Sequence, residues 1–463
     1  MSEGRFLSGS TMGHVVRMTA TGAFGITFVF LVDAANLFWI AKLGDATLVA
    51  AIGFAFAIQF FSVSSGVGLM IASTAMVSRS IGAGQRAEAR TQAGAALVTA
   101  LLIQGLVAAL IVVFRHDLVA MAGATGQTAD LAARYLAITI PSLVPMAVGL
   151  ICSGVLRAEG FGAKAMYITL ISGALLMSTD PVLIYWMGWG LDGAAIGLVA
   201  FRAALMMLGL WFAAVQKDLI AKPDLAAIRR VLPVYLAIAL PAVATQLATP
   251  VGNYLLTIVI APFGDDAVAA WAVVGRLTVV AFGGIFALAG AIGGIFGQNY
   301  GAGQYDRLRS TYRDALIFCV VYTLSAWAVL VLATPQIIGW FGLSGQAAEV
   351  LRAFTFVGVG AFLFLGALFV SNAAFNALGR PLRSTMLNWV KDGAVSLPAA
   401  LFLAGIWGAP GVIYGQALAG AVIGAIAGVW GWKFVAGLQG APGPVLDAAP
   451  LRPYANPERY RRR

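Results

Sequence analysis

Two acidic residues lie inside long apolar stretches of this sequence, where a charge is costly. Asp33 occurs in GITFVFLVDAANLFWI at residues 25–40, and Asp180 in GALLMSTDPVL at residues 173–183. A carboxylate at mid-membrane depth costs about 2.5–3.5 kcal/mol on insertion scales, so an ionisable group there is functional by default. Such an acid can take up a proton, bind a metal cation or attract a cationic ligand. The structural alternative is that Asp33 pairs with a buried cation and that Asp180 supports a kink at Pro181.

The composition places both acids in a membrane protein. Of 463 residues, 60% are apolar and only 10% are charged, which no ordinary soluble domain of this length matches. Apolar runs of the roughly 20 residues needed to span a bilayer recur from residue 15 to residue 436. We therefore expect an all-α polytopic membrane protein with twelve transmembrane helices, at about residues 15–40, 46–78, 90–114, 129–156, 163–187, 192–216, 231–261, 266–299, 308–333, 347–377, 384–406 and 410–435.

The net charge of +10 is explained by orientation in the membrane. If the N-terminus is cytoplasmic, four Lys and Arg fall in outer loops and three fall in spans, which leaves 22 of the 29 on the inner side. This bias is what the positive-inside rule predicts. We therefore expect both termini to be cytoplasmic, and we expect contact with membrane lipid but no nucleic-acid partner.

The chain carries an internal repeat with an offset of about 219 residues. RSIGAGQRAEAR at 79–90 corresponds to QNYGAGQYDRLR at 298–309, and shorter matches recur at offsets of 218 to 220. An even number of helices in each copy gives parallel repeats, a transporter architecture with a site between the copies. We expect two six-helix pseudo-symmetric lobes that share a turn motif containing Gly82, Gly84, Gly301 and Gly303. The expected domains are a cytoplasmic N-terminal tail, an N-lobe, a cytoplasmic linker, a C-lobe and a basic cytoplasmic C-terminal tail, at residues 1–14, 15–216, 217–230, 231–436 and 437–463.

Together these motifs resemble the multidrug and toxic compound extrusion (MATE) family, closest to its bacterial DinF-like type. The Gly-Ala-Gly turn, LGDATLVAA at 43–51 and DPVLIYWMGWGLDGAAIG at 180–197 each lie in the helix expected for that family, and the resemblance covers about residues 15 to 435. It implies a secondary active antiporter of the bacterial inner (plasma) membrane, not an enzyme. Such an antiporter exports amphipathic or cationic organic compounds by alternating access. The resemblance also implies that Asp33 and Asp180, which match acids on helices 1 and 5, form the cation-coupling site.

The neighbours of the two acids depart from the family pattern. Leu176 and Ser172 stand where asparagines are frequent before the helix 5 acid, and Leu198 stands where a threonine is frequent on helix 6. Sodium requires several oxygen ligands, whereas protonation requires a single carboxyl group. The sequence therefore favours protons as the coupling ion, with sodium as the alternative, and it predicts neither a transition-metal site nor an organic cofactor.

Other polar and aromatic residues within the spans are weaker candidates. The polar residues expected to support the site are Ser172, Gln246, Asn253, Asn372 and Asn376. Substrate contacts are expected from four rings, although packing is the commoner role of aromatic residues in a span; these are Phe54, Phe56, Phe60 and Phe61. Arg202 and Arg276 are expected to snorkel or to pair structurally. Lys391 and Asp392 are adjacent on helix 11, so their side chains are expected to diverge.

Two other classes of function remain open. A flippase for a lipid-linked oligosaccharide needs a cation-lined cavity for the pyrophosphate, whereas here the buried acids outweigh any arginine cluster. A membrane-embedded enzyme is disfavoured, because the sequence offers no Ser/His or metal-binding constellation and Cys152 and Cys319 fall in apolar runs. The sequence also lacks a phosphate-binding G-x-x-x-x-G-K-[ST] loop, so ATP is not the expected energy source. We expect a monomer that handles small amphipathic molecules.

Overall fold

The structure is a computed structural model that describes residues 4–439. Within this range the secondary structure is helical, and twelve segments are long and apolar enough to cross a membrane. Each corresponds to one predicted span, which confirms the all-α polytopic fold class. The helices are α1 (Thr11–Ala41), α2 (Ala46–Gly82), α3 (Arg86–Val113), α4 (Arg115–Met121), α5 (Gly126–Thr139), α6 (Leu143–Glu159), α7 (Gly162–Pro181), α8 (Gly190–Leu210), α9 (Leu225–Ile260), α10 (Asp265–Gly301), α11 (Tyr305–Trp340), α12 (Gly345–Phe356), α13 (Phe362–Ala377), α14 (Pro381–Trp389), α15 (Ser396–Trp407) and α16 (Ala409–Ala436).

Several spans consist of more than one helix, joined by short turns of different geometry. The 3₁₀ turns η1 (Ile140–Ser142) and η5 (Gly358–Ala361) join α5 to α6 and α12 to α13. The π turns η2 (Val182–Trp186) and η6 (Val390–Val395) follow α7 and α14. Because η2 begins directly after Pro181, which lacks a backbone N–H donor, the helix departs from α geometry beside Asp180. Such π segments often occur at functional sites.

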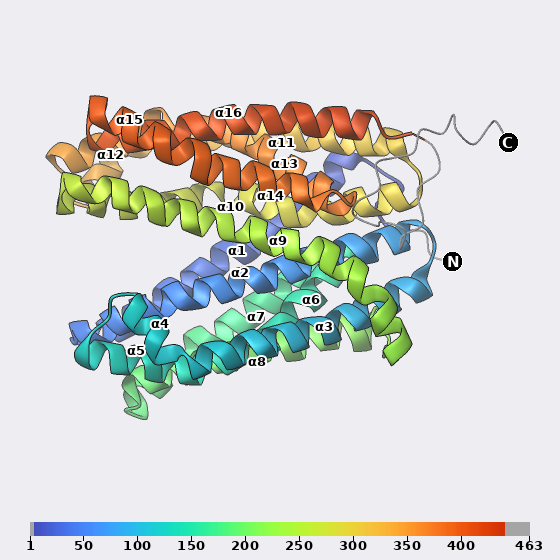
Figure 1. Cartoon of the computed structure of the whole chain (residues 1–463), viewed down its shortest axis with the longest axis horizontal. Helices are drawn as coiled ribbons and strands as arrows, with labels where there is room; N and C mark the ends of the chain where they lie inside the picture. The colour runs from blue at the N-terminus through green and yellow to red at the C-terminus, as the bar shows by residue number, and fades with distance from the viewer. Residues whose placement is uncertain (1–3, 440–463) are drawn as a thin grey trace.

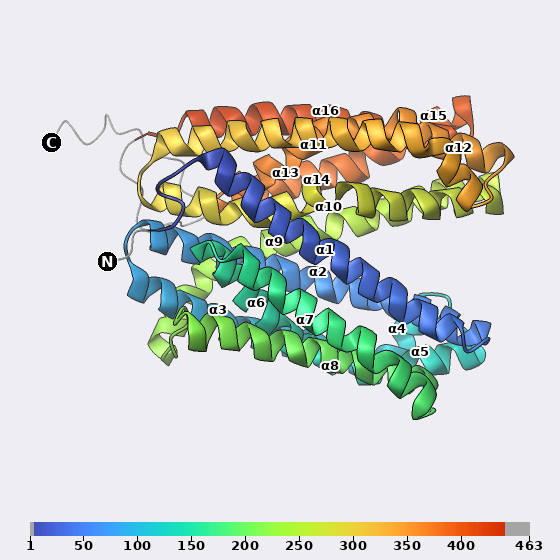
Figure 2. The ribbon, with the colours of Figure 1, turned by 180° about the vertical axis from the view of Figure 1, so that it is seen from behind.

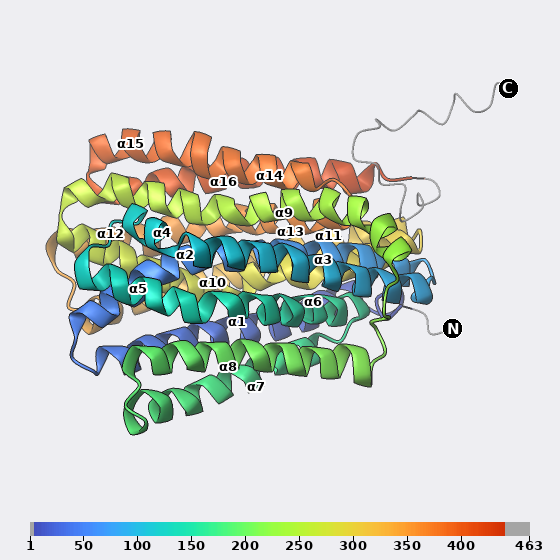
Figure 3. The ribbon, with the colours of Figure 1, turned by 60° about the horizontal axis from the view of Figure 1, so that its bottom comes forward.

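Two groups of helices make up the bundle, and they meet along four long helices. Figures 1 and 3 show α7 and α8 at one edge and α15 and α16 at the opposite edge. Between them α1 packs on α10, and α2 packs on both α9 and α10. The described chain begins and ends at the same end of the bundle (Figure 1), which we call the inner end.

The two groups exchange the starts of their first helices at the inner end. Figure 2 shows α1 running from one group at the inner end to the other group at the outer end. Val15 and Met18 of α1 lie in a buried cluster made largely by α10 to α16. Conversely, Val231 and Tyr235 of α9 lie in a cluster made by helices of the first group, and the Tyr235 hydroxyl donates to the Leu69 carbonyl at 2.9 Å. Each group therefore anchors the other, and the domain boundaries stay a prediction.

Burial changes along α2 and α10 at equivalent positions of the repeat. Residues 62–82 of α2 are buried or half-buried, whereas Phe60 and Phe61 before them are exposed. In α10, Val280 is exposed and residues 282–301 are buried or half-buried. Since α2 and α10 pack on each other, the two groups are in contact over the inner half of the bundle and separate towards the outer end.

Candidate functional site

Asp180 is a buried acid held between three helices. Its side chain on α7 is only 1% exposed, and Asn36 Nδ2 of α1 donates to its Oδ2 at 2.7 Å. Its Oδ1 accepts no hydrogen bond from the described residues. That oxygen faces Gly197 of α8, where a Cβ atom would lie 2.3 Å away. Glycine at this position therefore leaves room for the carboxylate.

Asp33 is the accessible acid of the pair. It lies on α1 one turn before Asn36, so the two side chains share a helix face, and unlike Asp180 it is exposed. Asn36 therefore connects an accessible carboxylate on its own helix with a buried carboxylate on α7. This arrangement can bind a proton or a cation at Asp33 and transmit the change in charge towards Asp180.

Arg202 of α8 supplies a buried positive charge to the same region, which corrects the expectation that it snorkels. The residue is 4% exposed. Its Nη1 donates to the Thr139 carbonyl at 2.9 Å and its Nη2 donates to Gln59 Oε1 at 2.6 Å. Arg202 also interacts electrostatically with Asp33. The site thus contains two acids and one cation, whereas Arg276 on α10 is exposed.

Few side-chain oxygens from α7 surround Asp180. Leu176, one turn before it, is buried and approaches Gly197, since a Cβ at Gly197 would lie 3.0 Å from Leu176 Cδ1. Ser172 is buried a further turn away, and its hydroxyl has no hydrogen-bond partner within the described chain. The surroundings of Asp180 are therefore mainly apolar on this side.

The polar residues predicted in the second half do not gather at one place. Gln246 is half-buried and Asn253 is exposed, both on α9. Asn372 and Asn376 are buried on α13, and the Asn376 carbonyl accepts a hydrogen bond from Arg79 at the inner end. The structure therefore places Asn376 in the contact between the halves and not beside Asn253.

Lys391 and Asp392 form an ion pair, contrary to the prediction that they diverge. Lys391 Nζ donates to Asp392 Oδ1, and both residues lie in the π turn η6. The wider turn rotates successive side chains differently from an α-helix, which the prediction assumed. Asp392 packs against α9 at Gly252, where a Cβ would lie 2.7 Å from the Asp392 Cβ.

Three of the four predicted substrate-contacting rings are exposed on α2. Phe56, Phe60 and Phe61 are exposed, and the Phe56 and Phe60 rings lie 6.0 Å apart between centroids. Phe54 is half-buried against a hydrophobic cluster. The exposed rings lie in the outer half of α2, where the two groups of helices separate, and they offer an apolar surface beside the acids.

The repeated glycine turn forms the closest contact between the halves. A Cβ at Gly82 would lie 2.0 Å from the Gln298 carbonyl oxygen, and a Cβ at Gly301 would lie 2.1 Å from the Arg79 carbonyl oxygen. Both pairs are separated by the repeat offset, so the contact is reciprocal. The turn glycines Gly84 and Gly303 have φ of 74° and 68°, a conformation that side chains rarely adopt.

Polar contacts reinforce this closure of the inner end. Arg79 Nε donates to the Ala377 carbonyl at 2.5 Å. Residues 4–10 are held as well: Gln298 Oε1 accepts from the Phe6 N–H at 3.0 Å, and Arg307 donates to the Phe6 carbonyl at 2.7 Å. The N-terminal segment thus binds to α10 and α11 and does not extend freely, while residues 440–463 of the predicted C-terminal tail lie outside the described residues.

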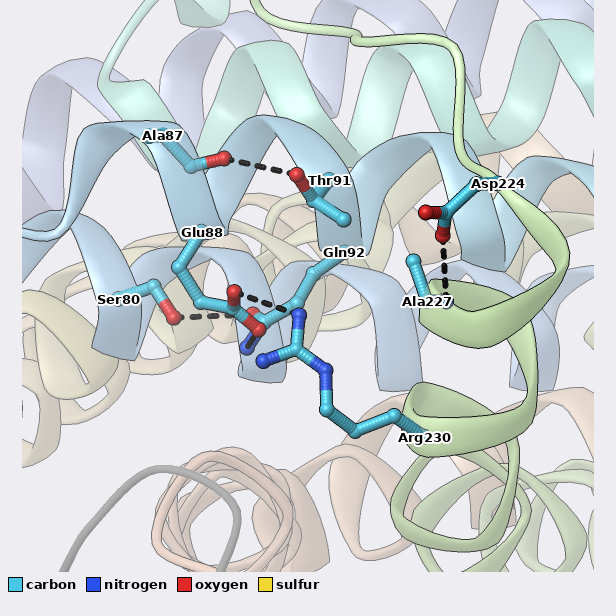
Figure 4. A network of polar contacts seen from close by, with 8 residues as sticks. All are labelled: Ser80, Ala87, Glu88, Thr91, Gln92, Asp224, Ala227 and Arg230. Atoms are coloured by element: carbon cyan, nitrogen blue, oxygen red, sulfur yellow. Dashed lines mark hydrogen bonds and ion pairs between the residues drawn. The ribbon is translucent and has the colours of Figure 1, made fainter.

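A further network ties the start of α9 to the first group of helices. Figure 4 shows Glu88 between Gln92 and Arg230, with Ser80 beyond Gln92. Arg230 pairs with Glu88 at 2.9 Å, and the Ser80 hydroxyl donates to Gln92 Oε1 at 2.9 Å. The Asp224 side chain caps α9 by accepting from the Ala227 N–H at 2.7 Å. The segment between the two halves is therefore anchored at both of its ends.

The comparison with protein families decides the identity of this architecture. The MatE family model matches residues 23–182 and again residues 241–401. The chain belongs to the MatE family. The two matched segments begin 218 residues apart (23 and 241) and end 219 residues apart (182 and 401), which agrees with the internal repeat. This multi-pass membrane protein is therefore a MATE transporter and not an enzyme.

Relatives with names cover most of this MATE transporter. It is 26% identical over 424 residues to a protein of Shewanella oneidensis named FAD transporter, a match that covers 89% of this chain and 93% of the relative. It is 20% identical to the multidrug export protein MepA of Staphylococcus aureus, with 83% and 85% covered. An Asp-to-Asn mutant of the Vibrio cholerae MATE transporter VcmN has the same fold, with a TM-score of 0.87 at 24% identity over 94% of this chain and 98% of that one.

A transporter of another stated superfamily also shares the fold. The structure of a MOP superfamily transporter from Pyrococcus furiosus, described as having a binding pocket of reverse polarity, has a TM-score of 0.86 at 20% identity over 94% of this chain and 98% of that one. The fold alone therefore leaves the polarity of the ligand undetermined, and the side chains of the site have to decide it.

Sequence reasoning missed two residues of this MATE site. Asn36 gave a usable signal, because an amide three residues after an intramembrane acid lies on the same helix face. Arg202 gave a weaker one: a buried arginine requires acceptors, but its acceptors come from α2 and η1 rather than from its own helix. Whether these residues act in transport stays a prediction.

Proposed function

We propose that this MATE transporter exports amphipathic, cationic organic compounds in exchange for protons, and that Asp33 is the group for which the two compete. One observation carries the proposal: an accessible carboxylate and a buried carboxylate lie on facing helices and are connected through Asn36. The apolar surroundings of Asp180 favour a proton over sodium, since sodium needs several oxygen ligands.

Coupling follows from the charge of Asp33. When ionised and accessible from the outer end, the carboxylate attracts a cationic compound; when protonated, it loses that charge and is buried more cheaply. Drug and proton then bind different states of the same group, and this difference in affinity shifts the equilibrium between conformations. One charge crossing about 100 mV supplies roughly 2.3 kcal/mol, and half a pH unit adds about 0.7 kcal/mol. Together they support a drug gradient on the order of 100-fold.

The test is dye efflux from everted vesicles, with the proton and sodium gradients collapsed separately. Asp33→Asn is expected to abolish proton-driven efflux, because the group that exchanges the proton is gone, and Asp180→Asn is expected to impair it severely. Asp130→Asn, which neutralises an exposed acid on α5, is the matched control and keeps full efflux. Full activity of Asp33→Asn, or strict dependence on sodium, would sink the assignment.

A second candidate is export of a flavin dinucleotide, because a relative of similar length is named FAD transporter. Two features suit such a ligand: exposed rings on α2 for stacking against an aromatic system and the exposed Arg276 for a phosphate. Chromatography of flavins in the medium of expressing cells separates the candidates. If the candidate holds, Arg276→Gln lowers flavin export and leaves dye efflux unchanged; equal loss of both argues against it.

A further inference from the structure

A second cavity lies at the inner end, away from the two acids. It has a volume of ≈ 210 Å³ and is lined by the start of α1, the residues preceding it and the start of α7. Three of its side chains are cationic, namely Arg5, Arg17 and Lys164. The volume is several times the ~30 Å³ that one water molecule occupies in the liquid, so the cavity can hold a phosphate-sized group.

The positive charge of this cavity is not balanced by the residues around it. Its lining contains no acidic side chain, and Lys217 adds like-charge repulsion on Lys164. The acid nearest in sequence, Glu159, is paired with Arg86 at 3.0 Å. Arg5 stacks over the Phe161 ring at 3.9 Å, and Lys217 lies over the same ring at 4.5 Å. These contacts position the cations without neutralising them.

Backbone dipoles add to the side-chain charge. α7 begins at Gly162, which lines the cavity together with Ala163. The first N–H groups of a helix have no intrahelical acceptor and favour an anion. A Cβ at Gly162 would lie 2.6 Å from Thr21 Oγ1 of α1, so the glycine permits the close packing that forms one wall of the cavity.

An apolar stripe continues from the cavity along α7. Tyr167 lines the cavity, and Ile171 and Leu175 follow at helical spacing. All three side chains are exposed, and they belong to a span that begins at Gly162. The cavity therefore lies where headgroups meet the end of a span, with a hydrocarbon-facing surface leading away from it.

We propose that this cavity binds the phosphate headgroup of an anionic phospholipid, one acyl chain of which lies along the α7 stripe. Lipid of the inner leaflet suits both features, because basic pockets between helix ends recognise its headgroups. A soluble phosphate compound shares the headgroup chemistry but has no use for the stripe. The bound lipid joins α1, which carries Asp33, to α7, which carries Asp180.

The experiment measures phosphatidylglycerol binding to purified transporter by native mass spectrometry and by thermal stabilisation in detergent. Phosphatidylcholine and inorganic phosphate are the comparison ligands. Arg17→Gln/Lys164→Gln is expected to weaken phosphatidylglycerol binding roughly 30-fold, since each cation contributes about 1 kcal/mol towards an anionic lipid. Lys222→Gln/Arg229→Gln removes the same charge from exposed positions outside the cavity and should bind normally. Arg17→Lys/Lys164→Arg keeps the charge and should retain binding.

The outcomes separate a lipid site from other possibilities. Retention of phosphatidylglycerol by the wild type, its loss from the double Gln variant and failure of inorganic phosphate to compete support the proposal. Equal competition by inorganic phosphate would replace the lipid with a soluble anion and overturn it. Equal binding by the double Gln variant and its control pair would also overturn it, because the lipid would then bind elsewhere.

Discussion

At the scale of single residues, the structure shows how buried charges are accommodated in an apolar bundle. Arg202 has carbonyl and amide acceptors, and Asp180 has the Asn36 amide. Lys391 and Asp392 have each other. A buried group that loses its partner is left uncompensated, and this loss costs more than the pair contributes over apolar residues of the same size.

The Lys391–Asp392 pair gives a testable consequence of this rule. The two side chains are 14% and 11% exposed. Lys391→Met is expected to destabilise the protein by about 3–5 kcal/mol because it strands a buried carboxylate. Lys391→Met/Asp392→Leu should recover most of that loss. Thermal unfolding in detergent, followed by tryptophan fluorescence, measures both effects.

The exposed pair of Arg134 and Asp192 is the matched control. With side chains 66% and 27% exposed, Arg134→Met should change stability by less than about 1 kcal/mol. If the double variant at Lys391 and Asp392 is as unstable as the single one, desolvation of an unpaired charge is not what holds this pair in place.

At the scale of helices, the sequence predicts existence better than geometry. Apolar runs predicted all twelve spans, and Pro181 predicted a local departure from α geometry. The π turn η6 was not predictable, because no proline or glycine precedes it and an ordinary helix was the default. The Lys391–Asp392 pairing was missed for that reason. Likewise, the repeat revealed Gly82 and Gly301, but their crossing depends on backbones that are far apart in sequence.

The crossing of α2 and α10 can be tested at Gly301. A Cβ there would lie 2.1 Å from a backbone carbonyl oxygen, which has little freedom to move. Gly301→Ala is expected to push the inner ends apart at a cost of about 1–3 kcal/mol. It should thereby raise hydrogen exchange in residues 62–82 and 282–301 and slow efflux roughly tenfold or more.

Gly293→Ala is the control for that substitution. It lies on the same helix, and a Cβ there meets nothing within 4 Å. Normal exchange and efflux are expected, because only the change in helix propensity differs between the variant and the wild type. Wild-type behaviour of Gly301→Ala would mean that the close crossing is not needed to close the inner end.

At the scale of the whole molecule, one end is closed and the other is open. Reciprocal glycine contacts, Arg79 and the N-terminal segment hold the inner ends together. The outer halves of α2 and α10 are exposed. Because the repeat makes the two halves equivalent, a rocking motion that breaks the inner contacts can bring the outer ends of α1 and α9 together. Transport by alternating access requires both states.

Disulfide cross-links test this motion at each end. Thr11 Oγ1 donates to Asp314 Oδ2 at 2.5 Å at the inner end, so Thr11→Cys/Asp314→Cys should lock that end closed. Ala41→Cys/Ala261→Cys joins the outer ends of α1 and α9 and should trap the opposite state. Each oxidised variant is expected to lose transport, because either lock prevents one half of the cycle, and reduction should restore it. Native Cys152 and Cys319 are buried and leave the assay undisturbed, while each single-cysteine variant controls for the substitution alone. Efflux at full rate from protein whose cross-link is verified at either end would exclude rocking between the two halves.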